Sequence, residues 1–376
     1  MSRWEQWLAD EAVSRDAAGL TRRLRPRGPD DDVVDLAGND YLGLSRHPSV
    51  VAAAAEAAVV WGAGSGASRL VTGTLALHAT LEQELAAFLA MPAALVMSTG
   101  YHANLAAVTG LADRDTLIVS DAHIHASLID AARLSRAEIS VVPHNDVHAV
   151  DAALSSGGGR RALVLAESVY SVLGDAAPLV ELLQVCAAHG ALLVVDEAHG
   201  LGVAGVGGHG LVRDLGLGGH PHVVVTATLS KSLGAQGGAV LGTPALVDHL
   251  VNRARPFIFD TALAPSATGG ALAALRVLRE NADLPERVRR RVKALAALLD
   301  VTTPAGAVLS VPMPSPYVAL QAQAECLEHG VRVGCFRPPS VPDGVSRLRI
   351  TTNAGVPDDY WARTCEVLAK VVEAHR

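Results

Sequence analysis

The stretch ALLVVDEAHG, Ala191 to Gly200, places an Asp-Glu-Ala-His run directly after a series of aliphatic side chains. Read alone, this run is typical of a helicase, in which an Asp-Glu pair holds magnesium for ATP hydrolysis. A nucleotide hydrolase of that kind also needs a G-x-x-x-x-G-K-S/T loop, whose backbone amides and lysine cradle the phosphates. The chain contains no Gly-Lys pair. We therefore expect Asp196 to have a different electrostatic task.

Short aliphatic runs alternate with segments of helical period on both sides of this stretch, between about residues 93 and 242. The runs read AALVM, TLIVS, ISVVP, ALVLA, ALLVV, HVVVT and GAVLG. Continuous apolar strands that alternate with helices indicate a mainly parallel sheet covered on both faces. We predict an α/β fold with a large α/β domain over residues 39–274. A helical N-terminal arm over residues 1–38 precedes it, and a smaller α+β domain over residues 275–376 follows it.

The composition indicates an enzyme-sized globular protein without a broad cationic surface. Half of the 376 residues are hydrophobic, and the net charge is −7. This charge disfavours nucleic acid as the main partner, although a basic run within residues 22–27 could meet one anionic ligand. No apolar run approaches the ~20 residues that a membrane span requires. The N-terminus mixes acids with bases and lacks an apolar segment, so we expect a cytoplasmic protein without a presequence.

The spacing of cysteine and histidine does not favour a metal site. The cysteines, which form no C-x-x-C pair, are Cys186, Cys326, Cys335 and Cys365. Structural thiols are therefore the better interpretation. The histidine pairs at residues 123 and 125 and at residues 144 and 148 have no carboxylate partner in a helix of the H-E-x-x-H kind. We expect no metal.

Unusual polar residues follow the predicted strands at the points where these strands end. They are Gly100, His125, Ser171, Asp196, His199 and Lys231. In open parallel sheets, ligands bind beyond the carboxyl ends of the strands. Each residue alone would more often be an ordinary loop residue, but their joint position at one edge of one sheet predicts a single site.

These residues together indicate the chemistry of that site. Lys231 lies in TATLSKSLGAQGG, where small neighbours leave room beside the amine, and a lysine held near an aldehyde can form a Schiff base. STGYHAN, residues 98–104, predicts a glycine turn that opens a helix, and the free amides of a helix N-terminus bind phosphate. An aldehyde with a phosphate is pyridoxal phosphate. Asp196 would then hold the protonated pyridine nitrogen, so that the ring accepts electrons.

The chain resembles the α-oxoamine synthases, which are fold-type I pyridoxal-phosphate transferases, over nearly its whole length. The motifs that carry this resemblance are NDYLGL (39–44), GSGASRLVTGTLALHATLE (64–82), SDAHIHASLID, ESVYSVLGD, VVDEAHGLG, TLSKSLGAQGG and RLRIT (347–351). The resemblance implies a pyridoxal 5'-phosphate enzyme that condenses an amino acid with an acyl thioester and releases carbon dioxide. It also implies a homodimer whose active sites lie at the subunit interface.

One further motif narrows the expected substrates. FRPPSVPDGVSRLRI, residues 336–350, is most similar to the members that condense L-alanine with a pimeloyl thioester in biotin synthesis. The acyl donor is either pimeloyl-CoA or a pimeloyl carrier protein. The alternatives are members that use glycine with succinyl-CoA or acetyl-CoA, and a catalytically inactive binding protein of the same fold.

The resemblance also implies roles for the residues that would hold and use the cofactor. Lys231 would bind the aldehyde and then remove the α-proton of the amino acid. Asp196 would bind the pyridine nitrogen and His199 the phenolic oxygen, while His125 would stack on the ring. The remaining cofactor contacts would come from Ser171 near the phenolic oxygen and, at the phosphate, from Gly100, Tyr101, Thr228 and the partner subunit's Thr261.

Substrate contacts are implied at both ends of the chain. Arg349 would clamp the carboxylate of the amino acid, a bidentate task suited to a guanidinium group, although it could instead be a surface residue, as Arg347 could. Arg22 and Ser340 match positions that contact the acyl substrate, and His125 is also expected to bind substrate. Two positions depart from the family pattern, because Asp260 stands where relatives often have Ser or Thr, and Leu173 where many have an acid or Met. The first departure weakens the assignment of Thr261.

Overall fold

The computed structural model describes residues 1–17, 20–22, 24–29, 31–338, 341 and 343–376. These residues divide into two compact units, Met1–Val33 and Val34–Arg376. The first unit contains helix α1 (Arg3–Ala17), none of whose residues is buried. Among the described residues, no helix combines the length and the apolar character that crossing a membrane requires.

In the described part of the second unit, the larger sheet has seven strands in the order β2-β8-β7-β6-β5-β3-β4. Their bounds are Ala93–Met97 (β2), Gly238–Gly242 (β8), Val223–Thr228 (β7), Leu192–Asp196 (β6), Ala162–Glu167 (β5), Leu117–Asp121 (β3) and Glu138–Val142 (β4). β8 pairs antiparallel with β2 and β7, and the remaining pairs are parallel. Since parallel neighbours need long crossovers, the helices between these strands pack onto the faces of the sheet.

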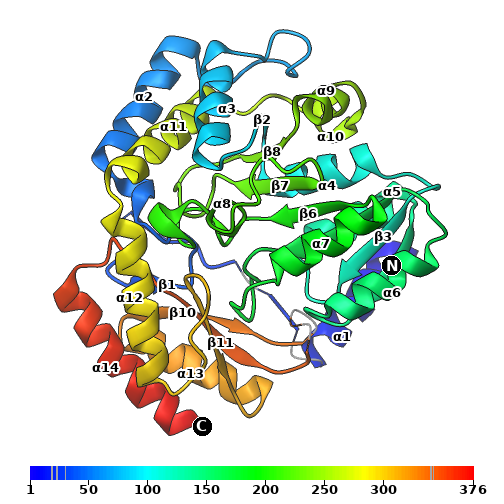
Figure 1. The fold of residues 1–376 in the computed structure, drawn as a ribbon. Coiled ribbons are helices and arrows are strands. Elements are labelled where there is room, and N and C mark those ends of the chain that lie inside the picture. Colours follow the sequence, from blue (N-terminus) through cyan, green and yellow to red (C-terminus); the bar gives the residue numbers. More distant parts are fainter. Residues whose placement is uncertain (18–19, 23, 30, 339–340, 342) are drawn as a thin grey trace. The chain divides into compact units, whose positions relative to one another are not determined.

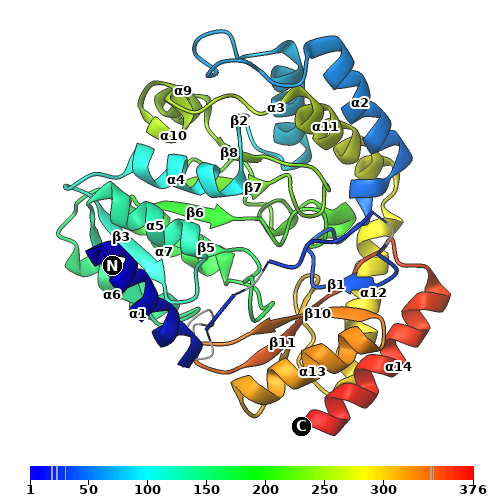
Figure 2. The same cartoon turned by 180° about the vertical axis from the view of Figure 1, so that it is seen from behind.

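Helices cover both faces of this sheet, as the continuous apolar strands predict (Figures 1 and 2). On β6, Leu193 and Val195 pack into one core cluster and Val194 into another, because successive side chains of a strand point to opposite faces. The first cluster includes residues of α2 (Pro48–Trp61), α3 (Ala76–Phe88), α6 (Val147–Ser156), α7 (Leu179–His189), α8 (Leu211–Asp214) and α11 (Pro265–Glu280). The second includes residues of α4 (Gly100–Leu111), α5 (Ala126–Ser135), α9 (Pro244–Arg253) and α10 (Arg255–Ile258). Short 3-10 helices, η1 (Leu44–Arg46) and η2 (Val206–Gly208), lie in the connecting loops.

A second sheet, β1-β10-β11-β9, lies beside three C-terminal helices (Figure 1). Its strands are Val34–Leu36 (β1), Val331–Phe336 (β10), Arg347–Thr351 (β11) and Val308–Pro312 (β9). Together with α12 (Asp283–Leu298), α13 (Pro316–Glu328) and α14 (Asp358–His375), they enclose a separate core cluster. β1 pairs parallel with β10, so a segment from before the large sheet completes the small one. The domain boundaries expected at residues 38/39 and 274/275 stay a prediction.

Candidate active site

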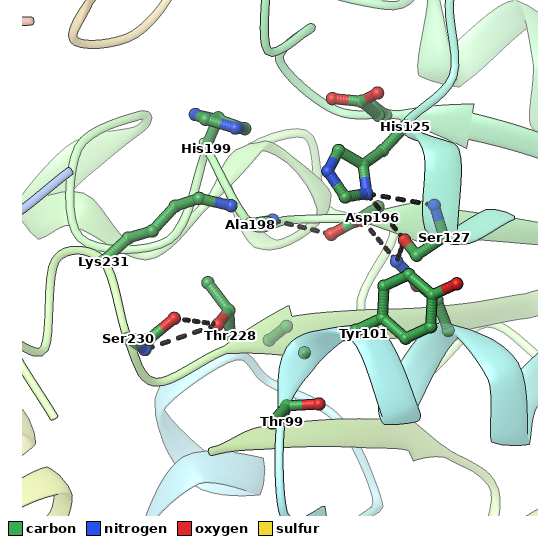
Figure 3. A pocket seen from close by; sticks show the side chains of 14 residues that line it. Thr99, Tyr101, His125, Ser127, Asp196, Ala198, His199, Thr228, Ser230 and Lys231 are labelled. Atoms are coloured by element: carbon green, nitrogen blue, oxygen red, sulfur yellow. Dashed lines mark hydrogen bonds between the residues drawn. The ribbon is translucent and has the colours of Figure 1, made fainter. Parts of the chain in front are cut away.

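A cavity of about 240 Å³ lies where β5, β6 and β7 end and α4 begins (Figure 3). It brings together residues from the strand ends, from two helix N-termini and from the loop after β7. The lining residues are Thr99, Gly100, Tyr101, Asn104, His125, Ser127, Glu167, Asp196, Ala198, His199, Ala227, Thr228, Ser230 and Lys231. Seven of the residues predicted from sequence are therefore side by side: Gly100, Tyr101, His125, Asp196, His199, Thr228 and Lys231.

Asp196 is the last residue of β6, and both of its carboxylate oxygens are held in place. Oδ2 accepts a hydrogen bond of 2.8 Å from Nδ2 of Asn104 on α4, and Oδ1 accepts one of 2.9 Å from the amide of Ala198. The side chain is buried and faces the cavity. A carboxylate fixed in this way is ready to pair with a cationic nitrogen in the cavity.

Lys231 extends into the cavity from the loop after β7 (Figure 3). The loop folds tightly because the amide of Gly234 donates to the carbonyl of Lys231 at 2.9 Å. Gly234 has φ of 59°, and a Cβ atom there would lie 2.3 Å from the backbone nitrogen of Ser45, so only glycine fits. Burial lowers the pKa of Lys231, while the Asp196 carboxylate, and Glu167 where it is ionised, oppose that shift. A larger fraction of neutral, nucleophilic amine is the consequence.

His199 and His125 approach the cavity with their rings fixed by hydrogen bonds. Nδ1 of His199 lies 2.7 Å from the hydroxyl of Tyr41, which in turn donates to Oδ1 of Asn39 at 3.0 Å. His125 is the N-cap of α5, and its Nδ1 accepts from the amide of Ser127 at 3.2 Å and lies 2.7 Å from the Ser127 hydroxyl. Burial lowers the pKa of both histidines; at His125 the Asp196 carboxylate opposes this shift without cancelling it, and the Lys231 cation reinforces the shift at both. Both rings are consequently neutral near pH 7.

The N-terminus of α4 forms a cradle opposite Thr228. Thr99 caps the helix, because its side chain accepts a hydrogen bond from the amide of His102. The amides of Gly100 and Tyr101 are the first two of the helix and have no acceptor within it. A Cβ atom on Gly100 would lie only 2.9 Å from both Cβ and Oγ1 of Thr228. Only glycine leaves this space open beside free amides, and such a space suits an anion such as phosphate.

Arg349 reaches the large domain from strand β11 of the small sheet. Its Nε donates to the backbone carbonyl of Ser171 at 2.8 Å, and its terminal nitrogens donate to Oδ1 of Asn39 at 3.2 Å. The guanidinium carbon also lies 5.3 Å from the ring centroid of Phe336. Arg349 is buried rather than exposed. Ser171 and Arg349 contact each other, and neither is among the residues that line the cavity.

Arg347 is also buried, at 2% exposure, and donates to Asp343 at 2.5 Å. The alternative that it is a surface residue is therefore wrong. Its side chain is covered by the fold around the small sheet, which a five-residue motif does not indicate.

Thr261 does not line this cavity. It is exposed and forms an isolated bridge with Ser68. The adjacent Asp260 accepts a hydrogen bond from Oγ of Ser98 and lies 3.2 Å from Nδ1 of His102. Asp260, the departure from the family pattern, thus has contacts within this chain. The role of Thr261 in a partner subunit stays a prediction.

The structure does not test the roles of two residues expected at the acyl substrate. Arg22 belongs to the unit Met1–Val33 and is exposed within it. Ser340 lies outside the described residues. Their assignments stay predictions.

Glu167, Asn104 and Tyr41 are site residues to which the sequence motifs assigned no role. Glu167 ends the buried strand β5, as Asp196 ends β6, so the same strand-end signal could have identified it. Asn104 lies one helical turn after Gly100 and faces the strand ends. Tyr41 gave no such signal, because it meets His199 from 158 residues away.

Comparison with known proteins places this geometry in a family. Residues 31–368 match the aminotransferase class I and II family. The chain is 54% identical to the 8-amino-7-oxononanoate synthase of Mycolicibacterium gilvum over 367 residues, which cover 97% of each chain. It is also 54% identical to the enzyme of that name from Mycolicibacterium smegmatis, over 98% of this chain and 97% of the relative.

Solved structures confirm the predicted fold type. A serine palmitoyltransferase from S. paucimobilis, solved with a bound PLP-myriocin aldimine, superposes with a TM-score of 0.90 at 30% identity, over 98% of this chain and 97% of that chain. The 8-amino-7-oxononanoate synthase of Francisella tularensis superposes with a TM-score of 0.78 at 26% identity, over 92% of this chain and 99% of that chain. The chain therefore belongs to the aminotransferase class I and II family and, within it, to the α-oxoamine synthases that its motifs resemble.

Proposed function

We propose that this chain catalyses the 8-amino-7-oxononanoate synthase reaction, in which L-alanine condenses with a pimeloyl thioester and carbon dioxide is released. The observation that carries this proposal is the meeting of Lys231, Asp196 and the N-terminus of α4 in one cavity. Relatives of that name, 54% identical over nearly the whole chain, support the choice of substrates.

The residues present fit pyridoxal 5'-phosphate. Lys231 offers an amine of lowered pKa for the aldehyde, and Asp196 offers a fixed, buried carboxylate for the pyridine nitrogen. The space beside Gly100, which a Cβ atom would fill, offers free amides and the Thr228 hydroxyl to the phosphate. When bound, the cofactor supplies an electron sink for the negative charge that develops at the α-carbon of the amino acid.

The roles of the protein residues follow from their protonation and contacts. The Lys231 amine would accept the α-proton of alanine, because burial lowers its pKa and so increases the fraction of neutral amine. With the cofactor bound, Asp196 would keep the pyridine nitrogen protonated, His199 would bind the phenolic oxygen and His125 would stack on the ring. Ser171, whose backbone carbonyl accepts from Arg349, would act near the same oxygen from outside the cavity lining.

Arg349 binds the carboxylate of alanine in this proposal. The oxygens to which it donates, Oδ1 of Asn39 and the Ser171 carbonyl, are neutral. The guanidinium charge is therefore available for a carboxylate, which it would bind with two parallel hydrogen bonds. Arg22, Ser340 and His125 contact the acyl substrate.

We also propose a homodimer in which Thr261 contacts the cofactor phosphate of the partner subunit. Exposed apolar side chains within residues 59–71 support an interface there, and they belong to Val59, Val60, Trp61, Leu70 and Val71. Light scattering after gel filtration should give twice the 38.8 kDa chain mass. A monomer that is fully active would contradict the shared site. A cytoplasmic location is part of the same proposal.

A substrate matrix tests the reaction. Carbon dioxide release and product mass are measured for alanine, glycine and serine, each with pimeloyl-CoA, a pimeloyl carrier protein, succinyl-CoA and acetyl-CoA. We expect alanine with a pimeloyl donor to give the highest kcat/KM. Glycine should be roughly 10- to 200-fold poorer, as is usual when one methyl group is missing from a fitted pocket. A preference for glycine with a shorter acyl-CoA would overturn the proposal in favour of a sister synthase.

A further inference from the structure

Glu167 and Asp196 place two buried carboxyl groups side by side in the cavity. They are the last residues of the neighbouring parallel strands β5 and β6, and their Cα atoms are partners in the register of the sheet. Their side chains therefore point to the same face. Both are at least 96% buried and both line the cavity. Both oxygens of Asp196 already accept hydrogen bonds from the protein. The remaining question is the protonation state of Glu167.

The two oxygens of Glu167 have different surroundings. Oε2 accepts a hydrogen bond of 3.0 Å from the amide of Ser171, and the carbonyl of the same residue accepts from Arg349. Oε1 is buried and has no hydrogen-bond partner among the described residues. A buried polar atom without a partner is costly, so a ligand atom in the cavity is the natural partner for it.

The charge balance of the cavity indicates which form of Glu167 meets that ligand. Burial raises the pKa of Glu167 to about 8, and the nearby Asp196 carboxylate acts in the same direction, while Lys231 and the backbone amides of Ser171 and His125 oppose the rise without cancelling it. Near pH 7 the group is therefore mostly a neutral acid with one O–H donor. Since Oε2 already accepts from an amide, the proton belongs on Oε1. The ionisable residues that face or adjoin Glu167 are Asp196, Lys231, His125, Tyr41 and Tyr170.

We propose that Glu167 is a ligand-binding residue of this site, in which Oε1 of the neutral acid donates a hydrogen bond to an acceptor oxygen of the bound cofactor or amino acid. Through Oε2 it also positions Ser171 and, with it, Arg349. The inference rests on the proposed function, because that function supplies ligands with acceptor oxygens.

Three variants test this inference. Glu167→Gln keeps the shape and a neutral N–H donor, whereas Glu167→Leu removes the donor. Glu197→Gln is the matched control, because burial also raises the pKa of Glu197, to about 7. Its oxygens, however, already have protein donors, Ser168 Oγ at 2.6 Å and the Val212 amide at 2.7 Å. Pyridoxal phosphate affinity is measured by equilibrium dialysis and alanine affinity by absorbance titration of the loaded protein.

We expect Glu167→Leu to weaken binding by about tenfold or more, and Glu167→Gln and Glu197→Gln to stay within about threefold of wild type. A loss in cofactor affinity without alanine assigns the acceptor oxygen to the cofactor. A loss only in the alanine titration assigns it to the amino acid. Wild-type affinities for both ligands in Glu167→Leu would overturn the inference, and so would a loss in Glu167→Gln as large as that in Glu167→Leu.

A pH series decides the matter if Glu167→Leu does not fold. Wild-type affinity should fall as pH rises through about 8, because the donor ionises. This fall should be absent in Glu167→Gln, while the effects of Lys231 and the other groups remain in both proteins. An identical pH dependence in the two proteins would overturn the inference. Failure of wild type to bind pyridoxal phosphate at all would instead refute the proposed function.

Discussion

Asn104 and Asp196 are joined by a 2.8 Å hydrogen bond from an amide nitrogen on α4 to a carboxylate oxygen at the end of β6. The same nitrogen also donates to Oγ of Ser127 at 2.8 Å, and that hydroxyl lies 2.7 Å from Nδ1 of His125. One buried amide thus fixes the group proposed to bind the pyridine nitrogen and, through Ser127, the group proposed to stack on the ring.

Loss of this amide should slow the chemistry without removing any charged group. In Asn104→Ala the Asp196 carboxylate loses one charged hydrogen bond, worth about 1.5–3 kcal/mol. We expect the exchange of the alanine α-proton in deuterium oxide to slow by roughly ten- to a hundred-fold. Asn252→Ala, which changes an exposed amide on α9, should exchange at the wild-type rate. Unchanged exchange in Asn104→Ala would show that Asp196 is oriented by other groups.

Removal of the Asp196 charge should have a larger effect than removal of its partner. Asp196→Asn keeps the shape of the side chain but leaves a buried cationic nitrogen unpaired, at a cost of about 3–5 kcal/mol. Cofactor should still bind, whereas α-proton exchange should fall by roughly 100- to 5,000-fold. Exchange near the wild-type rate would remove Asp196 from its proposed role.

Cofactor attachment can be assigned to one lysine with unusual clarity. The other lysines of the chain, Lys293 and Lys370, are exposed on α12 and α14. Lys231→Ala should fold yet lose the borohydride-reducible linkage to pyridoxal phosphate. Lys293→Ala and Lys370→Ala should keep it, as peptide mapping of the reduced proteins would establish. Stoichiometric labelling of Lys231→Ala would mean that another residue is the anchor.

Recognition of the amino acid should separate from recognition of the acyl group. Arg349→Ala removes a charged hydrogen bond, so alanine affinity should fall by roughly ten- to a hundred-fold while acyl-thioester affinity changes little. Arg22→Ala should do the reverse. Both affinities are measured for each variant, and Arg363→Ala, an exposed position on α14, serves as the control. Since Arg349 also holds Ser171 and Asn39, thermal melts must first establish that the variant is folded.

Stability should fall at alkaline pH because of His144. Burial lowers its pKa, but hydrogen bonds to Asp121 at 2.9 Å and Asp175 at 2.8 Å outweigh that effect and raise the pKa to about 9. In the unfolded chain the value is 6.5, so the stabilisation is complete below pH 6.5 and is lost as pH rises through about 9. It amounts to roughly 3 kcal/mol at most.

Urea unfolding between pH 6 and 10 measures this loss. The His144→Gln variant should be less stable than wild type at pH 6, and the two should converge as pH approaches 10. His189→Gln, which breaks an exposed pair with Asp151, should change stability by less than about 1 kcal/mol. Parallel curves for wild type and His144→Gln would contradict the expected charge on His144.

The sequence determined the parts of the protein that depend on local pattern. Alternating apolar and helical segments predicted the mainly parallel sheet, because a strand covered on both faces must be apolar throughout. The positions of Asp196, His125 and Lys231 after such strands then predicted a common site, since parallel strands end at the same edge. Gly100 followed from the same reasoning, because a helix N-terminus needs an open approach to bind an anion.

Tertiary structure decided the contacts between segments far apart in the chain. Tyr41 meets His199, Arg349 meets Asn39 and Ser171, and residues 34–36 pair with residues 331–333. No periodicity encodes these contacts, because they depend on how two sheets with separate cores are packed. The protonation of Glu167 belongs here as well. A glutamate at a strand end is ordinarily charged, and only its burial beside Asp196, in a cavity closed by distant segments, makes the neutral acid the favoured form.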